Sequence, residues 1–515
     1  MAARLDPWTE VLAALSLATD LANGHDYEKT LRSCTLAVGL AEAAGLDETQ
    51  VRAVFHATML RFIGCTSFAH EESLVFGDDV AARLAFATTD LGDKGELWRA
   101  GGEAMRGEPG ALRRLARRSV AMLRAATGLR DLFASQCEVG VRFGKRLSVD
   151  DAVVEALGRI HERWDGSGGP AGLRGEALGS VVSVVQVATL AELLHHRFGA
   201  EAAVEVAGQR SGHALAPEVC RALAAHAPAL FAPLRLGSAW DAFVAIGERF
   251  PMIGPEREVD EVVEVFADVA DLASVYTLGH SRAVAETVVA AAREQGRPAS
   301  EIGELRHAAL LHDLGRVAVP ASVWEKREPL TAADWERVRL HAYYGQRILG
   351  RAPALARVAE LACADHERSD GSGYPRGVSS SPPGARLLAA ADVWCAMRED
   401  RPHRPALSDA QARQELRAEV AAGRLDVEAV DAILGRTRGG GRSAETPVGL
   451  TAREIEVLRW VARGDTNKEV AGRLGISART VGHHLAHAYA KIGVSTRAAA
   501  ALFIVEQGLL QTDEG

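Results

Sequence analysis

Hydrophobic positions recur with a helical period over most of this sequence. Apolar residues repeat at i, i+3, i+4 and i+7 in stretches such as DEVVEVFADVADLASVY, which begins at Asp260. Ala, Leu, Arg and Glu dominate these stretches, and all four favour helix. The segment from Ser180 starts with β-branched residues but continues for too long to be a strand. We therefore predict an all-α protein.

Two interruptions of the helical pattern divide the chain into three regions. Gly and Pro punctuate residues 236–259, and a Gly-rich run follows residue 435. The composition of the second interruption is typical of a flexible linker. The predicted parts are a helical domain over 1–240, a second over 256–434, a flexible linker over 435–447 and a small domain over 448–513.

Composition narrows the functional classes. The 515 residues carry a formal net charge of −9, which excludes a generally basic nucleic-acid binder but not a local DNA-binding module. No apolar run reaches the ~18 residues of a membrane span. The six cysteines form no CxxC pair, which favours a reducing compartment over a disulfide framework. We expect a cytoplasmic protein with no membrane partner.

An internal repeat links the first two domains. HERWDGSGGPAGLRG begins at His161, and HERSDGSGYPRG begins 205 positions later at His366. Upstream positions pair as Lys29 with His280, Arg61 with His312 and Phe62 with Asp313. The first copy also contains an insertion of about 46 residues. We interpret the two domains as a tandem duplication of one helical domain.

The second copy carries an ordered set of histidines and aspartates at helix ends or in apolar helical runs. They are His280, His312, Asp313, His341, Asp365, His366 and Asp392. A buried charged Asp beside a His is costly unless it is paired or bound to a metal. Imidazole and carboxylate together suit Fe, Mn, Zn or Ni. Because the set exceeds what one ion needs, we expect two divalent transition metals, which could activate water for displacement at phosphorus.

His312, Asp313, His341 and His366 lie in the segments HDLGRVAVP, HAYYGQRIL and HERSDGSGYP, and Asp392 lies in ADVWCAMREDRPHRPAL. These segments, with His280 upstream, resemble the HD-GYP subfamily of HD phosphohydrolases. The resemblance implies tandem HD-type helical domains and hydrolysis of cyclic di-GMP at a site of two or three metals. It implies that Asp313 bridges the metals and that Arg316 assists catalysis. It also implies a substrate loop at Gly373, Tyr374 and Pro375.

Two departures from the family pattern keep other interpretations open. Arg316 stands where the family usually has lysine, and Asp365 replaces the first histidine of a usual His–His pair. Arg and Lys are not interchangeable at a phosphate. We favour a metal-dependent phosphodiesterase that binds or hydrolyses a cyclic dinucleotide. The alternatives are a catalytically inactive nucleotide sensor and a phosphohydrolase of another nucleotide.

The first copy has lost most of the ligand types. The equivalent positions read Lys29, Arg61, Phe62, Ile160, His161 and Val187. Only the histidine retains a side chain that commonly binds a metal, so we expect no catalysis in this copy. We interpret it as a regulatory or dimerising module and expect a homodimer.

The C-terminal segment has the pattern of a helix-turn-helix. Thr451 and Glu454 form a capping box, and a short helix over 467–474 is followed by a Gly-Ile-Ser turn. A third helix is predicted over about 479–491 and a fourth over about 497–507.

From Leu450 the chain resembles the four-helix DNA-binding domain of LuxR-type transcription regulators. The resemblance implies that duplex DNA is a partner and that the third helix enters the major groove. Candidate phosphate contacts are Lys468, Arg479, Thr480, His484 and Lys491, and candidate base-facing positions are Gly482, His483 and Ala486. We therefore expect a transcription regulator in which occupancy of the second copy alters DNA binding.

Overall fold

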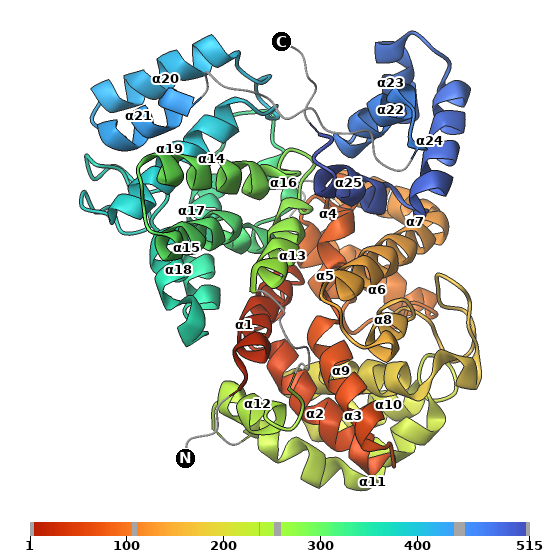
Figure 1. The fold of residues 1–515 in the computed structure, drawn as a ribbon. Helices are drawn as coiled ribbons and strands as arrows, with labels where there is room; N and C mark the ends of the chain where they lie inside the picture. Colours follow the sequence, from red (N-terminus) through yellow and green to blue (C-terminus); the bar gives the residue numbers. More distant parts are fainter. Residues whose placement is uncertain (1–4, 106–110, 236, 252–258, 437–448, 511–515) are drawn as a thin grey trace. The chain divides into compact units, whose positions relative to one another are not determined.

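The computed structural model describes residues 5–105, 111–235, 237–251, 259–436 and 449–510, and the side chains of 111–127 lie outside this description. Within these ranges the chain forms helices and isolated bridges but no β-strand. The prediction of an all-α protein is confirmed. The chain divides into two compact units, Met1–Glu261 and Val262–Gly515 (Figure 1).

The first unit is built around three packed helices, α2 (Lys29–Ala43), α3 (Glu48–Leu60) and α9 (Ser180–Phe198). An Asp47–Gln50 capping box starts α3. The other helices of this unit are α1 (Pro7–Ala22), α4 (Ala69–Phe76), α5 (Asp79–Phe86), α6 (Lys94–Ala104), α7 (Ala111–Arg146), α8 (Asp151–Leu157), α10 (Ala200–Gln209), α11 (Pro217–Phe231) and α12 (Ala239–Gly247), with 3-10 turns η1 (Cys65–Phe68), η2 (Gly175–Leu178) and η3 (Pro233–Arg235).

The predicted end of the first domain at residue 240 is too early. That boundary cuts through α12, whose Phe243 ring stacks on Phe55 at a centroid distance of 5.2 Å. Phe250 packs on the same ring at 5.5 Å, and its carbonyl lies 3.1 Å from Nε2 of His56. These buried aromatic contacts hold the chain in the first unit up to residue 251, the last described residue before the gap.

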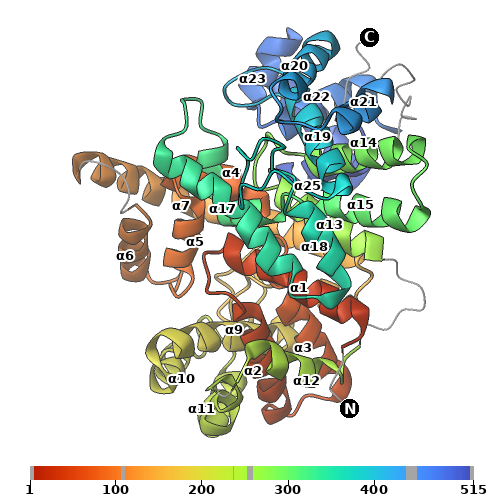
Figure 2. The same cartoon turned by 90° about the vertical axis from the view of Figure 1, so that its left-hand side faces the viewer.

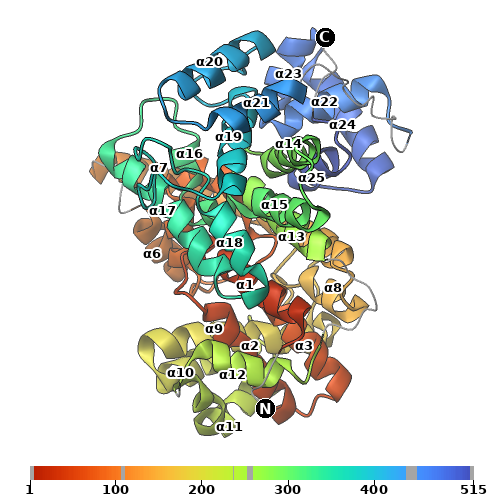
Figure 3. The same ribbon diagram turned by 60° about the vertical axis from the view of Figure 1, so that its left-hand side comes forward.

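The second unit contains the second HD-type copy and the C-terminal domain. In the copy, α14 (His280–Glu294), α15 (Ala299–Leu311), α18 (Ala356–Ala362) and α19 (Pro383–Met397) pack together (Figure 3). Its other helices are α13 (Val259–Asp271), α16 (Ala321–Trp324), α17 (Ala332–Leu349), α20 (Asp409–Ala421) and α21 (Val427–Arg436), with 3-10 turns η4 (Leu314–Ala318) and η5 (Pro353–Leu355).

The two copies share detailed structural features. In the first, the amide and hydroxyl of Thr30 both donate to Asp20, with the hydroxyl contact at 2.6 Å. In the second, the amide and hydroxyl of Ser281 both donate to Asp271, with the hydroxyl contact at 2.7 Å. In each copy these two hydrogen bonds anchor the first turn of a helix. The helix begins at Lys29, one residue before Thr30, or at His280, one residue before Ser281. The equivalence of these two positions therefore extends to the surrounding contacts.

A pair of glycines locates the insertion. A Cβ on Gly64 would lie 2.1 Å from the carbonyl oxygen of Gln136, and a Cβ on Gly315 would lie 2.0 Å from that of His341. Gln136 is thus the counterpart of His341. From Arg61 to Gln136 the chain runs 75 residues, against 29 from His312 to His341, a difference of 46. The additional residues lie between Gly64 and Gln136, in the segment that contains α4, α5, α6 and the start of α7 (Figure 2).

The C-terminal domain consists of α22 (Ala452–Ala462), α23 (Asn467–Leu474), α24 (Ala478–Ile492) and α25 (Arg497–Glu506). Val457, Val481 and Ile504 are fully buried in its core. The predicted capping box at Thr451 is present, and Gly475 ends α23 with φ +65°, a left-handed conformation that glycine adopts without strain. The predicted start of the linker at residue 435 is corrected, because α21 continues to Arg436. The helix therefore includes the first two residues of the predicted linker. Residues 437–447 lie outside the described residues.

Candidate functional site

The predicted ligands of the second copy converge on one buried cluster. His280 begins α14, His312 and Asp313 follow α15, and the remainder come from α17, from the segment after α18 and from α19. Three overlapping triads place potential ligand atoms within 4.8 Å of one another: His280, His312 and Asp313; Asp313, His341 and His366; and His312, Asp365 and Asp392. Together these triads include every side chain that the sequence analysis proposed as a metal ligand.

Glu399 holds His280, and the sequence analysis missed this residue. Nδ1 of His280 lies 3.0 Å from the Glu399 carboxylate, while Nε2 lies 3.1 Å from Oδ1 of Asp392. The Glu399 carboxylate therefore accepts a hydrogen bond from Nδ1–H and leaves Nε2 directed at the cluster, as carboxylates next to metal-binding histidines do. The only sequence signal was the position of Glu399, just after the Asp392 segment.

Backbone carbonyls orient two further imidazoles. Nδ1 of His312 lies 2.7 Å from the Ala309 carbonyl, and Nδ1 of His341 lies 2.5 Å from the Val338 carbonyl. Each bond leaves Nε2 free to face the cluster. Nε2 of His312 is buried and has no hydrogen-bond partner. The same holds for both carboxylate oxygens of Asp365. Such orphaned buried atoms are rare and costly, and a bound cation would satisfy them.

The electrostatics of the cluster also favour a cation. Burial opposes the charge on His312, yet Asp313 and Asp392 outweigh burial and raise the pKa of His312 to about 10. Burial raises the pKa of Asp365 to about 8, although His312 opposes that shift. The cluster therefore attracts positive charge, here in the form of protons. Its donor set of imidazoles and carboxylates fits a divalent transition metal.

The predicted substrate loop borders the cluster. A Cβ on Gly373 would lie 2.4 Å from the His366 carbonyl, so only glycine allows the loop to fold back at this point. The ring of Tyr374 stacks on His366 with centroids 4.7 Å apart. Nε2 of His366 lies 2.9 Å from Nε2 of His341, so the two imidazoles face each other. The loop thus presents an aromatic side chain at the edge of the candidate metal site.

Arg316 is held in place on two sides. Its Nη1 donates to Oδ2 of Asp313 at 2.8 Å, and its guanidinium carbon lies 3.8 Å from the ring centroid of Trp324. Burial opposes the charge on Asp313, but Arg316 and His312 hold the pKa of that carboxyl well below its usual range. Trp324 was not predicted, because its spacing from Arg316 follows no motif.

The equivalent positions of the first copy line a cavity instead. Lys29, Arg61, Phe62, Ile160 and His161 all border it, as does Gln136. Val187 is fully buried but is not a lining residue, whereas Thr189 lines the cavity. The offset of 205 residues that relates the two motifs falls to 203 at the following helix, since α9 begins at 180 and α19 at 383. The expected counterpart of Asp392 is therefore corrected from Val187 to Thr189.

The candidate DNA contacts cluster on α24 and at the start of α23. Lys468, Arg479, Thr480, His483 and Ala486 are exposed, whereas Gly482 and His484 are partly buried. The hydroxyl of Thr480 lies 2.8 Å from that of Ser477, the N-cap of α24. His487 is exposed one turn after His483 on the same face. The sequence analysis missed it, although its i+4 spacing could have identified it.

Lys491 has an intramolecular partner. Its Nζ lies 2.7 Å and 2.9 Å from the two carboxylate oxygens of Glu454. This hydrogen bond, with those from Thr451, lowers the pKa of Glu454 to about 2. Lys491 therefore links α24 to α22 within the domain, and a phosphate contact by the same ammonium stays a prediction.

Comparison with known proteins assigns both C-terminal parts. Residues 264–429 match the HD domain family model, and residues 448–504 match that of bacterial regulatory proteins of the luxR family. This chain joins an HD domain to a luxR-family domain. The resemblances to HD phosphohydrolases and to LuxR-type regulators are confirmed.

Proteins similar to this chain include cyclic dinucleotide phosphodiesterases. A 3'3'-cGAMP-specific phosphodiesterase of Vibrio cholerae is 25% identical over 428 residues, covering 78% of this chain and 88% of that protein. A cyclic di-GMP phosphodiesterase of Thermotoga maritima is 34% identical over 148 residues, covering 28% of this chain and 40% of that protein.

A solved structure supports the fold of both copies. The crystal structure of a cyclic GMP-AMP specific phosphodiesterase from V. cholerae matches with a TM-score of 0.55 at 21% identity, covering 83% of this chain and 97% of that chain. This coverage exceeds the HD and luxR-family segments together, so the likeness of fold reaches into the first copy.

None of the individual helices in the described ranges has the length and hydropathy of a membrane span. Helices α24 and α25 reach that length and hydropathy only together, and they are bent by 63° relative to each other.

Proposed function

We propose that the HD domain of this chain hydrolyses a cyclic dinucleotide with two bound divalent metals, and that the luxR-family domain binds duplex DNA. The observation that carries the proposal is the buried cluster in which Nε2 of His312 and both oxygens of Asp365 have no hydrogen-bond partner. A cluster with no ligand to bind would leave this desolvation cost uncompensated.

Each metal would have its own set of ligands. His280, His312, Asp313 and Asp392 would hold the first ion, and His341, Asp365 and His366 would hold the second together with Asp313. Asp313 shares one triad with His280 and His312 and another with His341 and His366, which supports its role as the shared ligand. Such ions, when bound, supply positive charge that polarises a phosphodiester and makes water more acidic. Fe, Mn, Zn and Ni all suit this donor set.

Protein side chains would orient the substrate. Arg316 lies beside Asp313 and would offset charge on the phosphoryl oxygens. Tyr374, in the loop with Gly373 and Pro375, would form one wall of the substrate site. The named relatives act on 3'3'-cGAMP and on cyclic di-GMP, and both molecules are cyclic dinucleotides.

A sensor without turnover is the second candidate. Arg316 is already bonded to Asp313 and lies over Trp324, so its guanidinium is partly committed before any substrate binds. Asp365 also places a carboxyl group where the family has an imidazole. A third candidate is hydrolysis of another nucleotide at the same cluster.

Metal content and turnover of the full chain test the proposal. We expect about two metal ions per chain and hydrolysis of 3'3'-cGAMP or cyclic di-GMP, measured by chromatography. Asp313→Ala should abolish turnover without unfolding the protein. Glu360→Gln, which changes an exposed carboxylate on α18, is the matched control and should retain activity. Full metal loading with no turnover of either dinucleotide would favour the sensor, and turnover of a different nucleotide would favour the third candidate.

For the luxR-family domain we propose that α24 enters the major groove of DNA in a homodimeric chain. The exposed Arg479, His483 and His487 support this orientation. Lys468→Ala should weaken binding to specific and scrambled duplexes alike and flatten the log–log salt slope by about 0.9 for each phosphate that is no longer neutralised. His483→Ala should instead reduce the preference for the specific duplex. Equal effects of Lys468→Ala and His483→Ala on both quantities would contradict this orientation of α24.

A further inference from the structure

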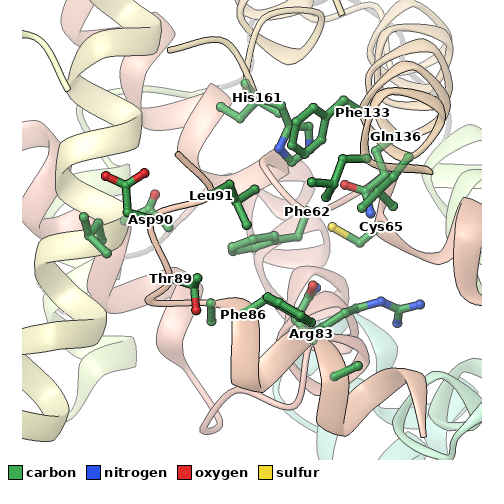
Figure 4. Close-up of a pocket in the computed structure, with 18 of the residues that line it drawn as sticks. Phe62, Cys65, Arg83, Phe86, Thr89, Asp90, Leu91, Phe133, Gln136 and His161 are labelled. Atoms are coloured by element: carbon green, nitrogen blue, oxygen red, sulfur yellow. The ribbon is translucent and has the colours of Figure 1, made fainter. Parts of the chain in front are cut away.

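The first copy contains a partly open cavity of about 390 Å³ at the place where the second copy carries its His/Asp cluster. Aromatic side chains form much of its wall. Figure 4 shows Phe62 between Phe133 and His161 on one side and Phe86 on the other. The rings of Phe133 and His161 are stacked at 4.7 Å. A cavity of this size whose exposed wall area is mostly apolar is typical of small-molecule sites.

Arg61 brings an uncompensated charge to this cavity. Among the described residues it has no ion pair, and its Nε and Nη1 atoms are buried with no hydrogen-bond partner. Burial lowers the pKa of Arg61 to about 10. The thiols of Cys65 and Cys137 oppose this shift, and no carboxylate among the described residues does. The donors on Nε and Nη1 are therefore available to a planar oxyanion such as a carboxylate.

Lys29 lies on the same wall. It is 1% exposed, and its Nζ also lacks a hydrogen-bond partner. The ring of Phe62 lies 4.8 Å from Nζ of Lys29 and 5.3 Å from the guanidinium carbon of Arg61, so both cations contact one aromatic ring. Asp20 and Glu192 attract Lys29 from the protein interior. Glu192 is itself paired with Arg32 at 2.6 Å.

Most other charged side chains around the cavity are matched within the protein. Arg83 pairs with Glu72 at 2.6 Å, Arg163 pairs with Asp90 at 2.6 Å, and Arg210 pairs with Glu96 at 2.9 Å. The carboxylate of Glu162 accepts three backbone amides, those of residues 171–173. Glu71 adds one partly buried carboxylate to the wall. The unmatched positive charge is therefore localised at Arg61 and Lys29.

We propose that this cavity is a binding site for an amphipathic organic anion. Its single acidic group would pair with Arg61 and Lys29, and its apolar or aromatic body would pack against Phe62, Phe86 and Phe133. The inference is independent of hydrolysis in the second copy. One free guanidinium and one partly compensated ammonium match one acidic group, and the apolar walls exclude a highly charged ligand.

A matched pair of fluorescent probes tests the site in the full chain. 8-Anilinonaphthalene-1-sulfonate carries an acidic group on an aromatic body, and N-phenyl-1-naphthylamine is its uncharged relative. We expect one saturable sulfonate site per chain. Arg61→Met should weaken binding of the sulfonate about tenfold to a hundredfold, because methionine cannot donate a charge-assisted hydrogen bond, and should change binding of the uncharged probe little.

Three more variants complete the test. Gly101→Leu should reduce binding of both probes, because Gly101 lines the cavity and a Cβ there would meet nothing within 4 Å. Lys29→Met should act like Arg61→Met but more weakly, and it provides a second charge variant if Arg61→Met fails to fold. Lys94→Met, at an exposed position on α6, should change neither probe. The proposal fails if the charge variants weaken both probes equally, or if Gly101→Leu leaves sulfonate binding intact.

Discussion

The two copies use one scaffold to surround chemically opposite centres. In the second copy the centre is a cluster of imidazoles and carboxylates that attracts cations. In the first copy the corresponding place carries Lys29, Arg61 and Phe62, and its unmatched charge is positive. The features that hold the backbone are retained in both. The carboxylates of Glu162 and Glu367 accept amides from the same positions of their loops.

This difference separates the demands of the fold from those of the site. Backbone contacts such as those of Asp20 and Asp271 define helix starts, and their loss would disturb the fold in either copy. The centre tolerates replacement because new side chains fill the same space. Phe133 illustrates this, since it stacks on His161 at 4.7 Å, as Tyr374 stacks on His366. Gly169, the counterpart of Tyr374, leaves room for that ring.

Removal of the second centre gives the largest expected effect. The double variant His312→Ala/Asp313→Ala of the full chain should lose all metal, from about two ions per chain to none, as measured by elemental analysis. The physical reason is that these two residues contribute to all three triads. Stoichiometric metal retained by this variant would place an ion elsewhere, and the contrast between the copies would then fail.

Glu399→Ala tests the support of the second centre. Loss of the carboxylate that orients His280 should weaken metal affinity or turnover by about 10- to 100-fold. A metal titration followed by assays at saturating metal would separate the two effects. Glu415→Ala, at an exposed position on α20, is the control. Unchanged metal affinity in Glu399→Ala would show that His280 needs no such partner.

Exchange of an aromatic ring between the copies is the third test. Gly169→Tyr should destabilise the first copy by about 1–3 kcal/mol, because overpacking displaces buried side chains. A Cβ at residue 169 would already lie 3.2 Å from Cδ2 of Phe133. The double variant Phe133→Ala/Gly169→Tyr should recover part of that loss in thermal unfolding. Additive destabilisation by the two changes would contradict the idea that the rings replace each other.

Lys29→Met should produce the smallest change. Burial lowers the pKa of Lys29 to about 8 from an ordinary value of 10.5. The charged side chain therefore reduces the free energy of unfolding below pH 8, and this cost disappears as the pH rises towards 10.5. We expect Lys29→Met to raise the melting temperature by roughly 2–4 °C at pH 7 and by less at pH 10. A gain in melting temperature that is larger at pH 10 than at pH 7 would contradict a lowered pKa of Lys29.

Much of this organisation could be predicted from the sequence. The helical period of apolar residues indicated the all-α fold, and the repeat at His161 and His366 indicated the duplication. The seven candidate ligands could be identified because their segments keep recognisable residue types at helix ends. The helix-turn-helix followed from capping residues and glycines that act locally. Local signals of this kind depend on residues a few positions apart.

The tertiary structure decided what depends on contacts between distant residues. It placed Glu399 against His280 and Trp324 against Arg316, and it paired Lys491 with Glu454. It also matched Gln136 with His341 across the insertion and moved the counterpart of Asp392 to Thr189. Above all, it placed Arg61, which has no counter-ion among the described residues, beside a cavity. Because burial and charge compensation depend on every helix that surrounds a side chain, no spacing along the chain could have predicted them.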